Sequence, residues 1–122
     1  MSDLEQVRED IRQRYPEMFA SFVRIMEDMM DTFCKKQNDY GPSNIALGSS
    51  LSTDGEIQAS STGVAFRMND KMQRIVNLVI QQRRPAVEDE SVLDSVQDLA
   101  VYCVIFLILN SKTSEDLSCW GR

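Results

Sequence analysis

Charged residues at helical spacing stand out in the second half of the chain. Three carboxylates one helical turn apart form a set that we call the acidic row: Glu90, Asp94 and Asp98. Four charged residues at intervals of three and four form a second set, the basic stripe: Arg67, Asp70, Lys71 and Arg74. On a helix, each spacing places its members along one face. Arg and Lys could bind the phosphates of a small ligand directly, and the acidic row could hold a Mg²⁺ ion that binds them.

The surrounding sequence indicates that both sets are sheltered from water. The acidic row leads into eleven consecutive apolar residues, 99–109, and Val64 and Leu78 continue the face of the basic stripe at its two ends. Sheltered carboxylates destabilise a fold unless cations neutralise them. The loop between the two segments is short enough for antiparallel packing, so the basic stripe is one source of those cations. Three interpretations stay open: a salt-bridge network without a ligand, an interface between identical subunits, and a ligand site.

The segment KKQNDYGPSN, residues 35–44, adds further polar side chains. Gly41 and Pro42 are typical of a helix end, and we expect a positive φ at Gly41. Helix termination does not account for the charged and aromatic residues beside them. Lys36 is expected to bind a phosphate group, and the Tyr40 ring is expected to stack on a base or ribose. The complete set of ligand-binding residues predicted in this segment is Lys36, Asp39, Tyr40 and Asn44.

The periodicity of apolar residues predicts an all-α fold, a bundle of about four to five helices. Capping boxes begin at Ser2 and Thr53. The glycine- and serine-rich residues 37–63 are expected to be mostly irregular, with one short helix. A stripe of apolar residues is expected to face the core: Phe19, Phe22, Val23, Met26, Met29, Met30 and Phe33. The expected helices are 3–14, 17–36, a short one from about 54, 63–82, and 88–110 as the central helix.

Composition bounds the class of protein. The 122 residues fit a single helical domain, 1–122, with its core at about 15–110 and a tail at 112–122. The net charge of −6 argues against binding to duplex nucleic acid. The absence of histidine excludes the usual zinc sites and the Ser-His and Cys-His pairs. Three cysteines without a CxxC motif suit a reducing cytoplasm, and the apolar run 99–109 is shorter than the ~20 residues of a membrane span.

A third acidic set is Glu27, Asp28 and Asp31. Its EDxxD spacing is similar to the EExxE motif of the all-α NTP pyrophosphohydrolases, which hold Mg²⁺ against phosphates. The second motif of those enzymes, ExxD, is represented only by ExxxD and DxxxD in the acidic row. Arg24 and Lys35 lie four residues from members of this set, so ordinary surface salt bridges are the favoured explanation for it.

Three motifs in order resemble the all-α nucleotide-modification-associated domain family of phages and prophages. The first, K-x-x-D-Y-G, falls on residues 36–41. The second, R-x-x-D-K-x-x-R, is the basic stripe, and the third, E-S-x-x-D-x-x-x-D-L-x-x-Y, runs from Glu90 to Tyr102. The match covers about residues 26–108. The resemblance implies a helical protein associated with nucleotide or DNA-base modification, without a defined reaction.

From these observations we predict a nucleotide-binding, homo-oligomeric protein of the bacterial host cytoplasm with no membrane association. The basic residues would contact phosphates, and the acidic row would hold Mg²⁺. If the protein is an enzyme, the predicted reaction is Mg²⁺-dependent hydrolysis of a nucleotide phosphoanhydride. One alternative is a non-catalytic sensor or a sponge that sequesters a signalling nucleotide. A second is a structural or accessory oligomeric protein whose charged rows pair only with each other.

Overall fold

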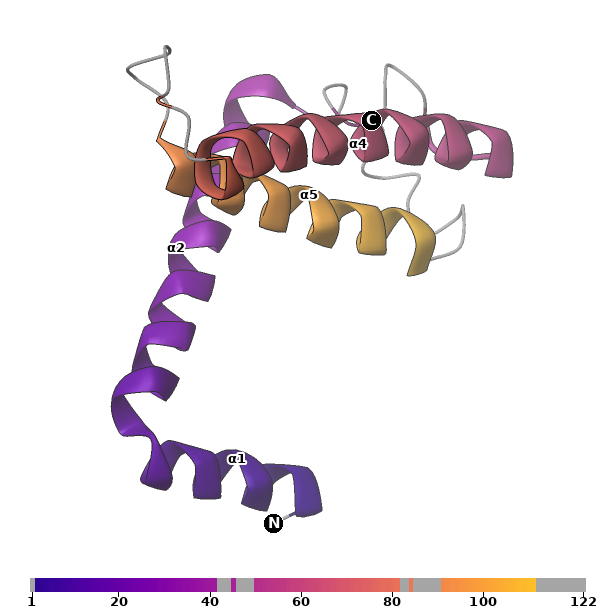
Figure 1. Ribbon diagram of the computed structural model, residues 1–122. Helices are drawn as coiled ribbons and strands as arrows, with labels where there is room; N and C mark the ends of the chain where they lie inside the picture. The colour runs from indigo at the N-terminus through magenta and orange to yellow at the C-terminus, as the bar shows by residue number, and fades with distance from the viewer. Residues whose placement is uncertain (1, 42–44, 46–49, 82–83, 85–90, 112–122) are drawn as a thin grey trace. The chain divides into compact units, whose positions relative to one another are not determined.

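The computed structural model of this protein describes residues 2–41, 45, 50–81, 84 and 91–111. It contains the α-helices α1 (Asp3–Arg14), α2 (Pro16–Tyr40), α4 (Asp54–Ile75) and α5 (Val92–Ser111), and the π-helix η1 (Val76–Ile80) (Figure 1). The described residues include no strand, and the predicted all-α helical class is confirmed. The contacts of the chain divide into two units, Met1–Lys36 and Gln37–Arg122.

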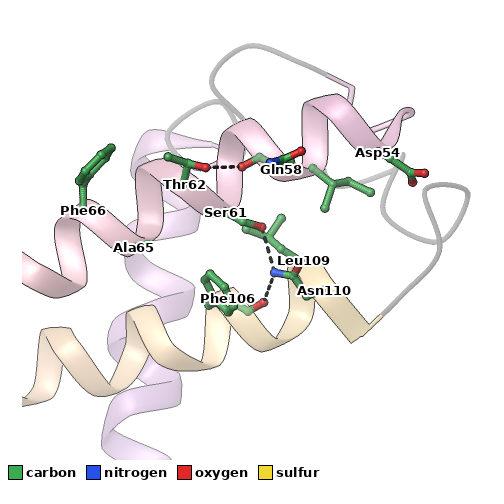
Figure 2. A pocket seen from close by; sticks show the side chains of 10 residues that line it. Asp54, Gln58, Ser61, Thr62, Ala65, Phe66, Phe106, Leu109 and Asn110 are labelled. Carbon is green, nitrogen blue, oxygen red and sulfur yellow. Dashed lines mark hydrogen bonds between the residues drawn. The ribbon is translucent and has the colours of Figure 1, made fainter.

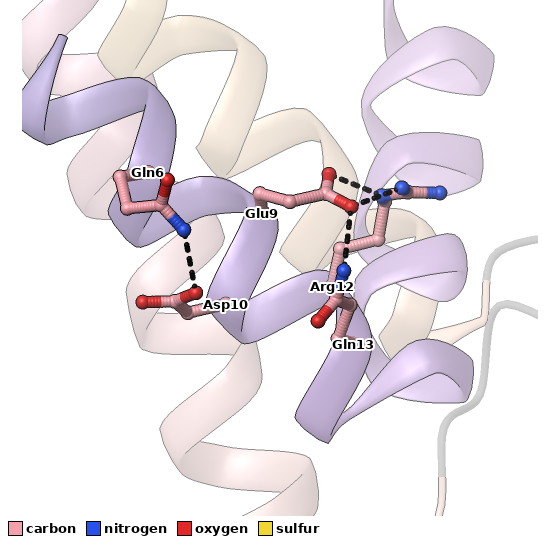
Figure 3. A network of polar contacts seen from close by, with 5 residues as sticks. All are labelled: Gln6, Glu9, Asp10, Arg12 and Gln13. Atoms are coloured by element: carbon pink, nitrogen blue, oxygen red, sulfur yellow. Dashed lines mark hydrogen bonds and ion pairs between the residues drawn. The ribbon is translucent and has the colours of Figure 1, made fainter. Parts of the chain in front are cut away.

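Local polar contacts define the first unit. The capping box predicted at Ser2 is present: its hydroxyl accepts a hydrogen bond from the Glu5 backbone at 3.2 Å, and the Glu5 carboxylate accepts one from the Ser2 backbone at 2.8 Å. Along α1, Glu9 accepts hydrogen bonds from Arg12 and Gln13, as Figure 3 shows. These contacts lower the pKa of Glu9, chiefly through the Arg12 guanidinium. Helix α2 begins at Pro16. Proline suits the first position of a helix, because the backbone N–H that it lacks would have no partner within the helix there.

The first unit by itself does not bury the apolar stripe of α2. Neither α1 nor α2 contains a buried residue, and Phe22 and Met30 are 66% and 63% exposed. That these side chains face a core therefore stays a prediction. The 3–4 periodicity identifies the apolar face of a helix, but it does not identify what covers that face.

In the second unit, α4 and α5 pack antiparallel, side by side (Figure 1). Six apolar side chains are buried: Ile45, Leu51, Ile57, Val64, Ile105 and Leu109. Small residues at the contact, Ser60 and Ser61 on α4 and Ser95 on α5, are also buried. Their size allows the two helix backbones to approach closely, and this positions the polar side chains further along the hairpin.

Several helix boundaries differ from the sequence predictions, among them those on either side of residues 41–53. The short helix expected near 54 and the helix expected from 63 are one helix, because Gly63 does not interrupt α4. Residues 54–63 are therefore helical and not irregular; Thr53 caps them by accepting a hydrogen bond from the Glu56 backbone at 3.1 Å. Helix α2 extends four residues beyond the predicted end, to Tyr40, and Gly41 follows with the predicted positive φ, 70°.

Among the described residues, α5 is long and apolar enough to cross a membrane by length and composition. The expectation that this segment is too short rested on the apolar run 99–109, whereas the helix begins at Val92. The core helix of a soluble protein passes the same test, so the finding is weak evidence for a membrane span.

Candidate functional site

The basic stripe of α4 faces the acidic row of α5 within one subunit. Three contacts cross between the helices, and we call them the α4–α5 ladder: Lys71 with Asp98, Arg74 with Ser95, and Arg67 with Tyr102. The pairs run in opposite directions along the two helices, as antiparallel packing requires. The predicted neutralisation of the acidic row by the neighbouring helix is therefore confirmed for its best-sheltered member, Asp98.

The central contact of the ladder is an ion pair. Lys71 Nζ lies 3.1 Å from Asp98 Oδ2, and the two side chains are only 23% and 25% exposed. Each charge is largely removed from water, so this pair is expected to contribute more to stability than a solvent-exposed ion pair. This contact holds α4 and α5 in one relative position.

Arg74 fixes the start of α5. Its Nη1 donates to the buried Ser95 hydroxyl at 2.7 Å and to the Ser91 carbonyl at 3.0 Å. Asp94 belongs to a capping box that the sequence analysis did not identify. Its backbone N–H donates to Ser91 Oγ, and its carboxylate accepts from the Ser91 backbone, both at 3.1 Å.

The capping box lowers the pKa of Asp94. The backbone hydrogen bond from Ser91 is the largest cause, its hydroxyl the next, and the positive charge of Arg74 adds to both. Asp94 is nevertheless exposed. The premise that the entire acidic row is sheltered was wrong for this residue, which stabilises the helix terminus at the surface of the hairpin.

Arg67 is held differently from the other two cations of the stripe. Its guanidinium carbon lies 6.0 Å from the centre of the Tyr102 ring, a cation–π arrangement. Within the described part of the chain, the guanidinium makes no hydrogen bond. A guanidinium that lies against a ring uses its face, whereas its five N–H donors point outward in its own plane. Arg67 can therefore bind an anion without breaking an existing hydrogen bond.

None of the three ladder contacts includes another of the predicted residues that the structure describes. Asp70 is exposed on α4. Asp39 accepts a hydrogen bond from the neighbouring Asn38 side chain at 3.3 Å, and Tyr40, at the end of α2, is 67% exposed. Lys36 is the last residue of the first unit. Asn44 and Glu90 lie outside the described residues.

The described carboxylates do not by themselves form a metal site. Over residues 2–41, 45, 50–81, 84 and 91–111, no group of three or more His, Cys, Asp or Glu side chains could hold a metal ion. Asp98 faces Lys71, and Asp94 caps α5. The set Glu27, Asp28 and Asp31 lies exposed along α2 and forms no such group either. A Mg²⁺ site on the acidic row stays a prediction that depends on Glu90.

A pocket of about 650 Å³ lies between the other ends of α4 and α5 (Figure 2). Its apolar lining includes Phe66 and Phe106. Its polar lining includes Asn110, whose amide donates to Ser61 Oγ and to the Phe106 carbonyl, both at 2.9 Å. No described residue donates a hydrogen bond to the Asn110 amide oxygen. The described lining residues are Asp54, Ile57, Gln58, Ser61, Thr62, Ala65, Phe66, Phe106, Leu109 and Asn110.

The sequence analysis did not find this pocket. Four of its five polar residues that the structure describes fall in residues 37–63, the segment expected to be mostly irregular, and the fifth, Asn110, ends a helix that was interpreted as core. The one available signal was the capping box at Thr53, which places Gln58 and Ser61 on a helix if that helix is extended through Gly63.

No protein-family model, curated protein or solved structure matches this chain. The resemblance to the nucleotide-modification-associated domain family therefore stays a prediction.

Proposed function

We propose that the α4–α5 hairpin binds a nucleotide, with phosphate at Arg67 and the heterocyclic base in the pocket. The observation that carries this proposal is the state of Arg67: its guanidinium is positioned by the Tyr102 ring, while its donors make no hydrogen bond within the described residues. Arginine presents these donors in a planar fork that matches two phosphate oxygens. The cation–π contact orients the fork before a ligand arrives.

The chemistry of the pocket supports a base. Phe66 and Phe106 offer aromatic surfaces for a planar ring, and Gln58 and Asn110 carry amides, which can both donate and accept hydrogen bonds at the edge of a heterocycle. The lining residues that the structure describes include no Lys or Arg, so they suit a base better than a phosphate. Phe66 of the pocket and Arg67 of the ladder are consecutive residues of α4, and their side chains leave the helix in directions about 100° apart. A nucleotide that binds at both would therefore have to extend around α4.

Binding of phosphate by Lys71 or Arg74 would require an exchange of partners. Both are already engaged with α5, at Asp98 and at Ser91 and Ser95. Arg67 would supply the first contact, and the other two would add electrostatic attraction without leaving the ladder. Whether Mg²⁺ strengthens binding, and whether the protein hydrolyses a phosphoanhydride, are to be measured.

Isothermal titration calorimetry with a panel of nucleoside mono-, di- and triphosphates, with and without Mg²⁺, tests this proposal. Arg67→Ala should weaken binding by roughly 10- to 100-fold, because a hydrogen bond to a charged group contributes ~1.5–3 kcal/mol. Arg24→Ala, which removes an exposed arginine of α2, is the matched control and should leave the affinity unchanged. The same samples, assayed for released phosphate, separate an enzyme from a sensor or sponge.

A structural role is the second candidate, and the ladder favours it. The sheltered charges Lys71 and Asp98 compensate each other, so the ladder needs no ligand to be stable. For a structural protein, no nucleotide in the panel would bind or raise the melting temperature, and Asp98→Asn would lower stability only.

A further inference from the structure

The hydrogen bonds of Asn110 determine what this side chain can offer to a ligand in the α4–α5 pocket. Its amide nitrogen donates to the Ser61 hydroxyl and to the Phe106 carbonyl, both at 2.9 Å. A carboxamide nitrogen carries two hydrogens, and these two contacts use both of them. Asn110 is therefore left with its amide oxygen, which accepts a hydrogen bond but cannot donate one.

The hairpin holds the Asn110 amide in this orientation from two sides. Ser61 lies on α4 and is only 6% exposed, and Phe106 lies one turn earlier on α5, as Figure 2 shows. A backbone carbonyl only accepts hydrogen bonds, so a reversed amide would place two oxygen atoms against each other at Phe106. The direction of the Asn110 amide is thus set before a ligand binds.

The other exposed polar side chains among the described lining residues are also mainly acceptors. Thr62 donates its hydroxyl hydrogen to the Gln58 carbonyl at 2.8 Å, which leaves the lone pairs of the hydroxyl oxygen. Asp54 contributes a carboxylate, which accepts hydrogen bonds. In this group, only the Gln58 amide can donate as well as accept. A ligand that matches this lining must therefore supply most of the hydrogens.

We infer that the pocket selects a base that carries an exocyclic amino group, such as adenine or cytosine. An amino group has two N–H donors in the plane of the ring, so it can donate to Asn110 while the ring lies against Phe66 and Phe106. A base without this group leaves the Asn110 oxygen unpaired. The inference rests on the proposed function for the placement of the base in the pocket, but it does not depend on phosphate binding at Arg67.

Titrations of the intact chain with four ligands, followed by NMR, test the inference. Adenosine and purine riboside differ only in the amino group, and their 5′-monophosphates repeat this difference in the presence of a phosphate. Because one hydrogen bond is lost, adenosine should bind roughly 2- to 10-fold more tightly than purine riboside, with and without the phosphate. Cytidine and pyrimidin-2-one riboside give the same comparison for a smaller ring.

Two variants assign the preference to Asn110. Asn110→Leu removes the amide oxygen at similar side-chain size and should abolish the preference for the amino group. Asn69→Leu makes the same change at an exposed position of α4 outside the described pocket lining, and it should keep the preference. Circular dichroism melting checks that both variants are folded. If Asn110→Leu does not fold, the comparison of ligands on the unmodified protein still decides.

Equal affinity within both the purine and the pyrimidine pair, or a preference that persists in Asn110→Leu, would overturn the inference. Failure of the proposed function gives a different result: a preference for the amino group without any gain from the 5′-phosphate would refute only phosphate binding at Arg67. Tighter binding of the monophosphates without a preference for the amino group would refute only the inference. No binding of any of these ligands at millimolar concentration would refute both.

Discussion

Replacing Asp98 with Asn removes the negative charge that faces Lys71 between α4 and α5. Exposed ion pairs contribute ~0.2–1 kcal/mol, whereas removal of one partner from a fully buried pair costs ~3–5 kcal/mol. Because about three-quarters of each side chain is sheltered, we expect Asp98→Asn to lower the free energy of unfolding by ~2 kcal/mol. Lys71→Met keeps the apolar stem of the lysine, and the two changes together should cost less than their sum by ~1 kcal/mol.

Urea unfolding, followed by circular dichroism at one protein concentration for all variants, measures this double-mutant cycle. The comparison variant is Glu9→Gln, which breaks the Glu9–Arg12 pair within α1; because Arg12 is 58% exposed there, the change should cost clearly less than Asp98→Asn. The coupling should persist in 1 M NaCl, since sheltered pairs are screened much less than surface pairs. A coupling below ~0.3 kcal/mol, within the error of additivity, would refute the argument that the ladder holds the hairpin together.

Two further predictions concern helix ends. The capping box holds the pKa of Asp94 below its ordinary value of 3.8, so its stabilising effect is complete above about pH 4 and is lost as the pH falls through the lowered value. Asp94→Asn should therefore flatten the acid limb of melting temperature against pH, and an unchanged limb would contradict this cause. Gly41→Ala should cost ~1–2 kcal/mol, because φ is 70° although an added Cβ meets nothing within 4 Å. Gly55→Ala, in an ordinary helical conformation, should be neutral or stabilising in the same melting assay.

The contact between the charged rows could be predicted from sequence because it depends on local periodicity. Residues at i, i+4 and i+7 share a helix face, and a short loop favours antiparallel packing. The individual partners could not be predicted. The pairing of Lys71 with Asp98 and of Arg74 with Ser95 depends on how the two helices align, and neither the periodicity nor the length of the loop determines that alignment.

Helix starts were predictable where a capping residue stood alone, as at Ser2. The start of α5 was placed four residues too early because Glu88, Asp89 and Glu90 resemble a first helical turn, whereas Ser91 and Asp94 form the cap. Burial was the least predictable property. The α5 sequence is apolar on all sides, yet Leu107 is 65% exposed. Hydrophobicity alone therefore does not indicate which side chains the fold buries.

The proposed role of Arg67 is tested most directly by NMR titration of the arginine side chains with a nucleotide. The proposal predicts that the Arg67 Nε–H resonance moves with the ligand concentration, that the Phe66 and Phe106 ring signals move with the same dissociation constant, and that Arg24 does not respond. Shifts confined to other arginines, or an unchanged Arg67 signal at millimolar nucleotide, would contradict the assignment of this hairpin as a nucleotide site.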